Sequence, residues 1–345
     1  MGAQGGEEDL AGARAGDGEA FARLAGRYRA ELRVHCYRML GSLEEAEDLV
    51  QETFLRAWKN LHGFEGRSTL RAWLYRIATN ACLDSLDGRA RRVLPHQVEA
   101  PSWPDEARSV HTEFSWLQPF PDSLYEQAEA QPESAAVARE TIELAFLAAI
   151  QCLPPRQRAV LILRDVLGWP ARETAALLDG SVASANSALQ RARTTLREHL
   201  PADRWEWTAR EPTERERAVL RRYMDAVERA DLAAMAELLA DEVRATMPPY
   251  PMWFQGRDAL MAALAMSWDP ASPSYVGRFR MVPTRANGRP AAAAYIRSPG
   301  ETVHRAVGIG LLGIEDGLIV DLTAFHDPAL FPLFGFPLEI PPEHR

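Results

Sequence analysis

Six prolines between residues 93 and 138 exclude a long helix from that segment, so it separates the sequence before it from the sequence after it. This division constrains the fold more than any other feature of the sequence. On one side, residues 18–92 place apolar side chains at helical spacing and lack β-branched runs, which predicts helices. On the other side, residues 139–200 return to a helical pattern, and a shorter break follows at 201–212. The chain is therefore expected to be multidomain, since 345 residues are enough for two or three separate cores.

The last third of the chain has a different pattern. Helical segments at 214–239 and 258–266 precede segments that look like strands, and Glu315-Asp316-Gly317 is a hairpin signal between the last two strands. Helices followed by a meander of strands predict an α+β domain of about a hundred residues. The expected strands are 276–283, 290–298, 303–314 and 318–325.

Charge is distributed unevenly along the chain. The net charge of −9 argues against nonspecific coating of nucleic acid, which depends on neutralising many phosphates. Yet residues 66–92 carry a net charge of +4, whereas the proline-rich residues 93–138 carry −7. The acidic segment also holds aromatic side chains that a solvated tether would not need, so we expect it to bind something. These aromatic residues are Trp103, Phe114, Trp116, Phe120 and Tyr125.

The N-terminus has no basic head followed by an apolar run, and no stretch approaches the roughly 20 apolar residues of a membrane helix. We therefore expect a cytoplasmic protein with no membrane partner. Cys36, Cys82 and Cys152 lie on separate helical patterns without a Cys-x-x-Cys pair, which favours structural thiols over a disulfide framework or a metal site. No cofactor is expected.

The first helical block contains a helix with an acidic face. Within residues 44–58, the side chains of Glu45, Asp48 and Glu52 share one face beside an apolar stripe. Such a face is either an ordinary solvated surface or a docking surface for a basic partner.

The next helix, at about 69–87, carries Arg76 and Asn80 one turn apart and Trp73 nearby. Arginine for phosphates, an aromatic ring for stacking and an amide for a base edge suit a helix that reads unpaired DNA. The same residues also fit a plainer interpretation, in which Trp73 belongs to the core and Asn80 to the surface.

The second helical block has the pattern of a helix-turn-helix. Proline at the tolerated first turn begins one helix at about residue 154, and a short helix at 170–178 ends at the turn Asp179-Gly180. Ser181 is a good N-cap for a longer helix that runs to about Arg197. A second helix of this kind enters the major groove, where amide and guanidinium groups pair with base edges. Ala185, Leu189, Ala192 and Leu196 are expected to pack inward.

The stretch from Asp48 to Arg92, DLVQETFLRAWKNLHGFEGRSTLRAWLYRIATNACLDSLDGRARR, closely resembles a region of extracytoplasmic-function (ECF) sigma factors of the sigma-70 family. In that family the region binds core RNA polymerase and opens the −10 promoter element, which requires taking a base out of the stack. The resemblance implies that the face docking on the polymerase clamp helices comprises Asp48, Leu49, Gln51, Glu52 and Phe54. It implies that Arg71, Trp73, Arg76, Thr79 and Asn80 lie near the −10 strand, with Asn80 in or beside the pocket for the extruded base.

Residues 153–198, LPPRQRAVLILRDVLGWPARETAALLDGSVASANSALQRARTTLRE, resemble the sigma-factor region that reads the −35 element. The implied −35 contacts are Ser184, Asn186, Ser187, Gln190, Arg191 and Arg193. The reading helix begins Ser-Val-Ala-Ser-Ala-Asn-Ser, where many relatives carry a start like Thr-Val-Lys-Ser-Arg, so its local charge is lower. In related sigma factors the connector between the two regions threads through basic polymerase channels, and an acidic segment suits that route.

Residues 213–330 are additional to typical members of the family. The segment RRYMDAVERADLAAMAELLADEVRATMPPYP, followed by WFQGRDAL and strands, resembles the SnoaL-like, ketosteroid-isomerase-like cone fold. Such folds usually enclose a pocket, but fold resemblance does not establish chemistry, and the aromatic residues fit a core equally well. Regulation by ligand binding or by contact with the sigma domains is favoured over catalysis. The candidate pocket residues are Tyr223, Trp253, Phe254, Trp268, His304, Asp321 and His326.

The expected architecture is two all-α sigma domains, the second a helix-turn-helix, plus a C-terminal α+β cone-fold domain. The expected boundaries are 15–92 for sigma region 2, 93–138 for the acidic linker, 139–200 for sigma region 4 and 213–330 for the SnoaL-like domain.

The expected function is promoter-specific transcription initiation, with core RNA polymerase and promoter DNA as partners and the C-terminal domain regulating in cis. A small-molecule ligand of that domain and a separate anti-sigma factor stay open as further partners. Two alternatives stay open as well: a stand-alone DNA-binding regulator, and a ligand-binding or enzymatic SnoaL-like module fused to one.

Overall fold

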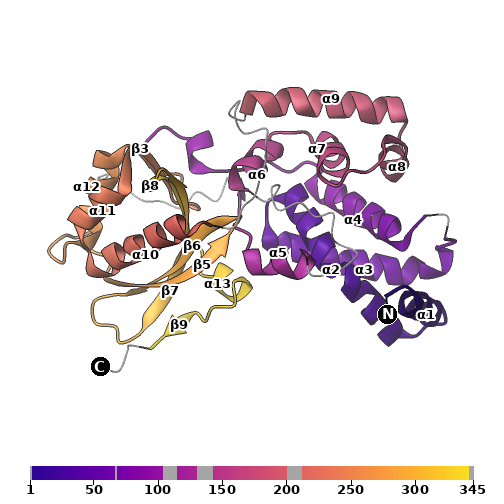
Figure 1. Cartoon of the computed structure of the whole chain (residues 1–345), viewed down its shortest axis with the longest axis horizontal. Helices are drawn as coiled ribbons and strands as arrows, with labels where there is room; N and C mark the ends of the chain where they lie inside the picture. The colour runs from indigo at the N-terminus through magenta and orange to yellow at the C-terminus, as the bar shows by residue number, and fades with distance from the viewer. Residues whose placement is uncertain (1, 67, 104–114, 130–142, 200–211, 342–345) are drawn as a thin grey trace. The chain divides into compact units, whose positions relative to one another are not determined.

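The computed structural model describes residues 2–66, 68–103, 115–129, 143–199 and 212–341. The chain divides into two compact units, one formed by residues 1–92 with 124–209 and the other by residues 93–123 with 210–345. The first unit is helical and the second contains a large sheet (Figure 1). Two helical blocks followed by an α+β domain were expected, and this fold class is confirmed.

The first helical block begins each of its main helices with a side-chain cap. Asp17, Ser42 and Thr69 accept hydrogen bonds from backbone N–H groups of the first turns. Gly41 takes the left-handed conformation, with φ of 70°, at the end of the second helix. The elements are α1 (Gly2–Arg14), α2 (Gly18–Leu40), α3 (Leu43–Asn60), the short η1 (Leu61–Gly63) and α4 (Leu70–Leu86).

Helix α2 is packed against α1, α3 and α4, and its second half is buried. Polar side chains are buried there as well as apolar ones, including Glu31, His35 and Arg38. Burial, with the neighbouring charges of Arg38 and Arg71, lowers the pKa of His35 to about 3. His35 is therefore neutral in the folded protein at neutral pH.

Cys36 and Cys82 are buried free thiols, and Cys152 is a half-buried one. Although 46 residues separate Cys36 from Cys82 in sequence, their side chains interact through a hydrogen bond. Burial, together with this neighbour, raises the pKa of Cys82 well above its usual value. The two thiols thus belong to one site of the core, which their separate helical patterns did not indicate.

The second helical block contains a buried arginine, Arg158, which is 2% exposed and makes hydrogen bonds to both helical blocks. Its guanidinium donates to backbone carbonyls of Ile150, Gln151 and Leu153 and to that of Met39 in α2. One arginine therefore joins the two helical blocks within the first unit. The elements are α6 (Leu144–Gln151), α7 (Pro155–Leu161), the π-helical turn η5 (Ile162–Val166), α8 (Ala171–Leu177) and α9 (Val182–His199), preceded by α5 (Asp122–Glu129).

The second unit is built on a sheet in which β4, β3, β8, β7, β6 and β5 follow one another, with β9 paired to β7. Strand β3 runs parallel to β8, and the other pairings are antiparallel. The strands are β3 (Leu239–Thr246), β4 (Trp253–Gln255), β5 (Arg278–Ala286), β6 (Arg289–Arg297), β7 (His304–Glu315), β8 (Leu318–Phe325) and β9 (Glu339–Ile340). The helices are α10 (Glu214–Arg229), α11 (Leu232–Leu238), α12 (Arg257–Trp268) and α13 (Leu330–Leu333).

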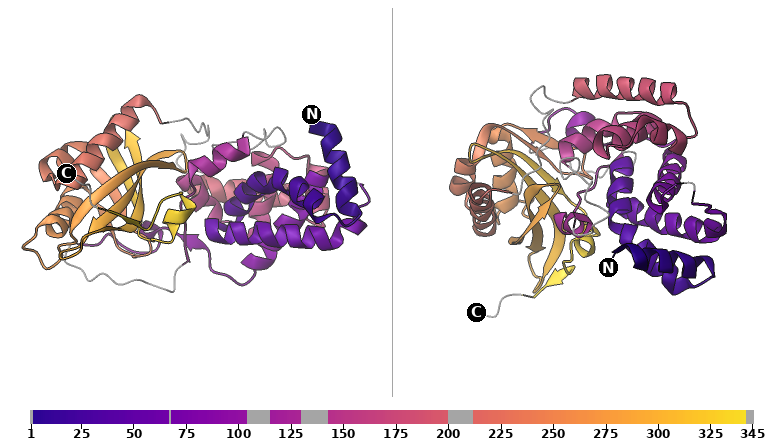
Figure 2. Two further views of the ribbon diagram at one scale, coloured as in Figure 1. Left: turned by 90° about the horizontal axis from the view of Figure 1, so that it is seen from below. Right: turned by 45° about the vertical axis from the view of Figure 1, so that its right-hand side comes forward.

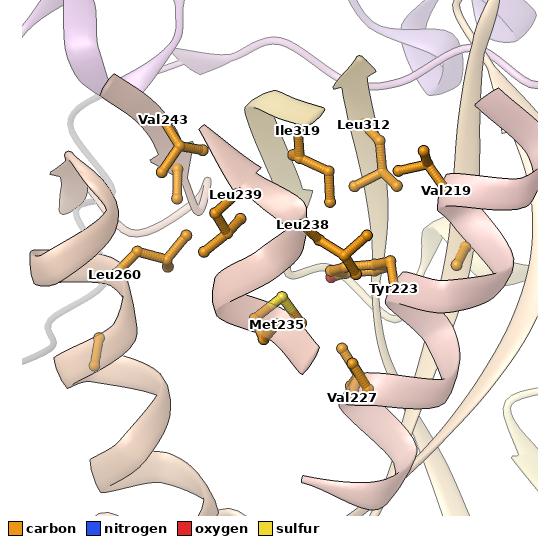
Figure 3. Packing of buried hydrophobic residues seen from close by; sticks show 14 of the residues in the cluster. Val219, Tyr223, Val227, Met235, Leu238, Leu239, Val243, Leu260, Leu312 and Ile319 are labelled. Atoms are coloured by element: carbon orange, nitrogen blue, oxygen red, sulfur yellow. The ribbon is translucent and has the colours of Figure 1, made fainter. Parts of the chain in front are cut away.

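The core of this unit lies between the sheet and three helices. Helix α10 packs on β5, β6 and β7, while α11 and α12 contact each other and the other strands (Figure 2). Figure 3 shows how Tyr223 and Val227 of α10 meet Met235 and Leu238 of α11 below Leu312 of β7. One face of the sheet is thus covered by apolar side chains from α10, α11 and α12.

The structure differs from the sequence-based prediction at 214–239, where one continuous helix was expected. The helix ends at Ala230, which has a φ of 54°, and Asp231 then caps α11. Residues 239–246 form β3, a strand that the predicted pattern did not contain. The hairpin expected at Glu315-Asp316-Gly317 is present, with positive φ at Asp316 and Gly317.

Residues 93–103 and 115–123 of the proline-rich segment belong to the second unit. Residues 92–93 form β1, which pairs with β2 (Ser115–Trp116), and a short helix η2 (Pro95–Gln97) follows β1. Next to the pair of β1 and β2, the Leu117 N–H donates to the Val93 carbonyl at 3.2 Å. Phe114 and the predicted linker residues 130–138 lie outside the described residues.

Candidate functional site

The outer face of α3 carries the residues that the resemblance assigns to polymerase docking. Asp48 and Gln51 are exposed, and Leu49, Glu52 and Phe54 are half-buried. The Glu52 carboxylate accepts a hydrogen bond from Arg56 Nε at 2.7 Å, one turn further along the helix. The helix therefore presents acidic groups to solvent on the side opposite its buried stripe.

Leu55 is exposed on the same helix, with 55% of its surface accessible. It lies seven residues after Asp48 and three after Glu52, so the three side chains share a face. Single exposed apolar side chains are common on protein surfaces, so it is the place of Leu55 beside the acidic residues that makes it a candidate contact. Leu55 was not among the predicted docking residues, although its position out of phase with the buried stripe could have indicated it.

Three residues assigned to the −10 element point into the helical unit. Arg71 Nη2 lies 2.7 Å from a carboxylate oxygen of the fully buried Glu31. Trp73 is half-buried against an apolar cluster, and the fully buried Thr79 has its hydroxyl 2.9 Å from His35 Nε2. These contacts fix the position of α4.

The other two −10 residues, Arg76 and Asn80, are accessible: Arg76 is exposed and Asn80 half-buried. Arg76 Nη2 donates to Asp179 Oδ1 at 2.7 Å, and Asp179 lies in the turn between α8 and α9. The rings of Tyr75 and Trp169 also meet, with 5.3 Å between centroids. Helix α4 is thus in direct contact with the helix-turn-helix.

Helix α9 has the amphipathic arrangement of a reading helix. Its N-terminus is capped reciprocally, because Ser184 N–H donates to Ser181 Oγ and Ser181 N–H donates to Ser184 Oγ. The predicted inward residues Ala185, Leu189, Ala192 and Leu196 are all buried. The predicted outward residues Ser184, Asn186, Ser187, Gln190 and Arg191 are all exposed.

Arg193 differs from the rest of the −35 set. It is half-buried, and its guanidinium makes two hydrogen bonds of 2.8 and 2.7 Å to the carboxylate of Asp165. The hydrogen bond to Asp165 raises the pKa of Arg193 despite its partial burial. This ion pair links α9 to the π-helical turn that follows α7.

The seven candidate pocket residues fall into separate places in the second unit. Tyr223, Phe254 and Trp268 belong to the apolar core, where burial raises the pKa of Tyr223 to about 12. His304 is half-buried at the start of β7, and the ring of His326 packs edge-on against Tyr250. The structure therefore gathers three of the seven and separates the others.

Asp321 on β8 forms an ion-pair cluster with Arg244 on β3 and Arg289 on β6, at 2.7 and 3.0 Å. Burial alone would raise the pKa of Asp321, but the charges of Arg289 and Arg244 outweigh it and keep the pKa below its usual value. Trp253 lies on β4, which β3 separates from β8, and its indole N–H donates to the Glu99 carbonyl at 2.8 Å.

Within the part of the chain that the structure describes, no helix is long and apolar enough to cross a membrane. In the same residues, no three His, Cys, Asp or Glu side chains are grouped so as to hold a metal ion.

The comparisons with known proteins agree on all three parts of the chain. Residues 24–92 match Sigma-70 region 2, residues 143–196 match Sigma-70, region 4, and residues 220–322 match the SnoaL-like domain. Over 311 residues the chain is 44% identical to the ECF RNA polymerase sigma factor SigG of Mycobacterium tuberculosis, an alignment covering 90% of this chain and 82% of SigG. The chain belongs to the ECF RNA polymerase sigma factors.

Other members of the family are similar in part or in fold. The ECF sigma factor SigW of Bacillus subtilis is 32% identical over 191 residues, which cover 54% of this sigma factor and 91% of SigW. The crystal structure of the ECF sigma factor SigJ of Mycobacterium tuberculosis shares the fold, with a TM-score of 0.54 and 22% identity over 92% of this chain and 99% of SigJ.

Family membership confirms the main predictions made from the sequence. The protein is a sigma factor with an additional SnoaL-like domain, and its partners are core RNA polymerase and promoter DNA. It acts as a transcription factor.

Proposed function

We propose that this sigma factor binds core polymerase through the exposed face of α3, contacts the −10 element through α4 and reads the −35 element through α9. The observation that carries the proposal is that the four predicted inward residues of α9 are buried and five of its six predicted outward residues are exposed. A helix anchored on one side and polar on the other can enter the major groove without rearrangement of the domain.

On α4 the proposed DNA contacts are Arg76 and Asn80, because these two side chains are accessible. Arg71 and Thr79 support them from within, since their polar groups are held by Glu31 and His35. A helix held in this way keeps its exposed side chains in place, which favours capture of a base that has left the stack.

We infer that the C-terminal domain regulates in cis and has no catalytic activity. Tyr223 is buried in an apolar core and its hydroxyl is hard to ionise. The Asp321 carboxylate is neutralised by two arginines, so it is a poor proton acceptor near neutral pH. Both properties favour a structural role for Tyr223 and Asp321 over a role in proton transfer.

Transcription in vitro with purified core polymerase tests both parts of the proposal. The full-length chain is expected to make core polymerase initiate at a promoter that carries matching −35 and −10 elements. A truncation after Leu200 is expected to differ in promoter output from the full-length chain, because the regulator is missing. Failure of the full-length chain to associate with core polymerase overturns the first part, and equal output from the two chains overturns the second.

A further inference from the structure

Helix α1 lies before the part of the chain that matches Sigma-70 region 2, which begins at residue 24. It is nevertheless held on α2 by a buried charge. Asp9 is 8% exposed, and its carboxylate lies 3.0 Å from Arg23 Nε and 2.6 Å from Arg27 Nη2, both on α2. A buried carboxylate requires such partners, because its burial alone is unfavourable. The two ion pairs therefore fix α1 at one place along α2.

The end of α1 packs closely against the same helix. A Cβ atom at Gly12 would lie 3.1 Å from the Ala20 Cβ, so a larger residue at this position would push the two helices apart. The next residue, Ala13, is 2% exposed and belongs to an apolar cluster with Ala20 and Phe64. Trp73 of α4 packs against that cluster as well. The end of α1 thus reaches the side chains on which the beginning of α4 rests.

Arg14, the last residue of α1, contacts Phe64 in two ways. Its guanidinium donates a hydrogen bond to the Phe64 carbonyl, and its Cζ lies 5.5 Å from the centroid of the Phe64 ring. A cation over an aromatic face is attracted by the ring electrons. The Phe64 ring in turn packs against the Trp73 indole, with 5.0 Å between centroids and 35° between the ring planes. The three side chains therefore form a row that runs from α1 to α4.

The three members of this row differ in their exposure to solvent. Phe64 is 7% exposed and Trp73 is half-buried, whereas Arg14 is exposed. Replacing Arg14 therefore opens no cavity in the core, and most exposed positions can be substituted with little change in stability. An effect of Arg14 on DNA binding can thus be measured in a folded protein.

Trp73 lies on the side of α4 that carries the two proposed DNA contacts. Arg76 follows Trp73 by three residues and Asn80 follows it by seven, so the three side chains share one face of the helix. Side chains that bind a ligand must be held to within about 0.5 Å of the productive geometry. A displacement of Trp73 therefore moves the face on which an unstacked base would be captured.

We propose that Arg14 is a positioning residue for recognition of the −10 element. Through Phe64 it holds Trp73 in place, and with Trp73 the face of α4 that carries the proposed DNA contacts. The inference rests on the proposed function, in which Arg76 and Asn80 contact the −10 element. It gives α1 a part in promoter opening, although α1 lies outside the residues that match Sigma-70 region 2.

The first test measures three affinities of the full-length chain: for core polymerase and, once assembled with it, for the unpaired −10 strand and for the −35 duplex of a promoter from which the wild type initiates. Arg14→Leu is expected to weaken −10 strand binding at least about five-fold, because the face of α4 is displaced. The other two affinities are expected to change less than about two-fold, because α3 and α9 do not contact Arg14.

Two further variants of α1 serve as controls. Arg14→Lys keeps a cation for the Phe64 ring and a donor for its carbonyl, so it is expected to bind the −10 strand within about two-fold of the wild type. Glu8 is exposed on the same helix, and Glu8→Ala is expected to match the wild type.

The outcomes separate this inference from the proposed function. Unchanged −10 binding by Arg14→Leu overturns the positioning role, and so does an equal loss of all three affinities, which would indicate general stabilisation. Asn80→Ala is the reference for the proposed function. If it binds the −10 strand as the wild type does, the assignment of α4 to the −10 element fails. If it binds weakly while Arg14→Leu binds normally, only the positioning role fails.

The second test asks whether Arg14 acts through Phe64. Phe64→Leu removes the ring that lies between Arg14 and Trp73. When one residue acts through another, the losses from the two single variants do not add. The double variant Arg14→Leu with Phe64→Leu is therefore expected to bind the −10 strand within about two-fold of Phe64→Leu alone. Fully additive losses would show that Arg14 acts independently of Phe64, and they overturn the proposal.

Discussion

The guanidinium of Arg76 and the carboxylate of Asp179 form an ion pair with 2.7 Å between Nη2 and Oδ1. Arg76 is proposed to contact the −10 element, and Asp179 begins the turn into the proposed −35 helix. Both residues are exposed, so the pair contributes at most about 1 kcal/mol to stability. Promoter elements that lie on the order of 80 Å apart cannot both be bound while this contact persists.

Breaking that ion pair separates two roles of Arg76. Arg76→Ala is expected to reduce open-complex formation about ten-fold, because a phosphate or base contact is lost. Asp179→Ala is expected to leave it unchanged or raise it up to about three-fold, because a surface pair is worth little and Arg76 is freed. Permanganate footprinting of the −10 strand measures both. Equal losses from the two variants would show that Arg76 acts through the ion pair and not on DNA.

If α9 reads the −35 element, substitutions at different positions of this helix are expected to weaken promoter binding to different extents. Gln190→Ala and Arg191→Ala are each expected to weaken promoter binding by about 1–3 kcal/mol, because each removes a contact to a base edge or phosphate. Arg197 lies about two turns after these residues on the same helix, so Arg197→Ala is a control for the loss of positive charge. Fluorescence anisotropy with a labelled promoter measures the three affinities. A loss from Arg197→Ala as large as that from Arg191→Ala contradicts specific reading by the exposed set.

The exposed Leu55 is predicted to be a contact of core polymerase. Leu55→Glu is expected to reduce affinity for core polymerase at least ten-fold, because a buried interface leucine is replaced by a charge. Leu55→Met preserves the apolar surface and is expected to bind within about two-fold of the wild type. Surface plasmon resonance with immobilised core enzyme gives both values. Unchanged binding by Leu55→Glu removes this residue from the interface.

Arg158 is predicted to be a stability determinant of the helical unit. Arg158→Met is expected to lower the free energy of unfolding by about 3 kcal/mol, because several buried carbonyl groups lose their donor. Urea denaturation followed by circular dichroism measures the change. The exposed Arg156, which makes a hydrogen bond to the Leu178 carbonyl, offers a control: Arg156→Met is expected to cost about 1 kcal/mol or less.

The lowered pKa of His35 is expected to make the stability of the same unit depend on pH. Its pKa is about 3 in the folded protein and near 6.5 when unfolded, so the unfolded state binds the extra proton between these values. The free energy of unfolding therefore falls as pH drops below 6.5, by about 1 kcal/mol between pH 7.5 and pH 5.5 from this residue alone. His35→Gln keeps a hydrogen-bonding group opposite Thr79 and is expected to show a smaller decrease over that interval. An unchanged decrease would assign the pH dependence to other groups.

Local patterns in the sequence predicted the parts of this fold that depend on neighbouring residues. Residues Ser181 to Leu196 illustrate this, because the cap and the four buried positions follow from composition and helical spacing. The turn at Asp316-Gly317 was predicted for the same reason. The equivalent Asn287-Gly288 turn carries an equally strong hairpin signal and was not named.

What the sequence did not predict depends on partners that are far away along the chain. Arg71 looked like a DNA contact because nothing near it in sequence suggests Glu31, 40 residues earlier, as its buried partner. Strand β3 was not predicted, since its acidic and alanine-rich sequence has little β-propensity and only pairing with β4 and β8 makes it a strand. The hydrogen bonds of Trp253 with Glu99 and of Phe120 with Asn287 join residues more than 150 positions apart, which no local pattern indicates.

The parallel pairing of β3 with β8 has a consequence for how this protein is made. The sheet cannot be completed until Phe325 has left the ribosome, whereas the helical unit ends near residue 199. At about 5–20 residues per second, the difference amounts to roughly 10 s of translation. During that interval a nascent chain already carries both regions proposed to read DNA but not yet the domain proposed to regulate them, so each new molecule is at first without its regulator.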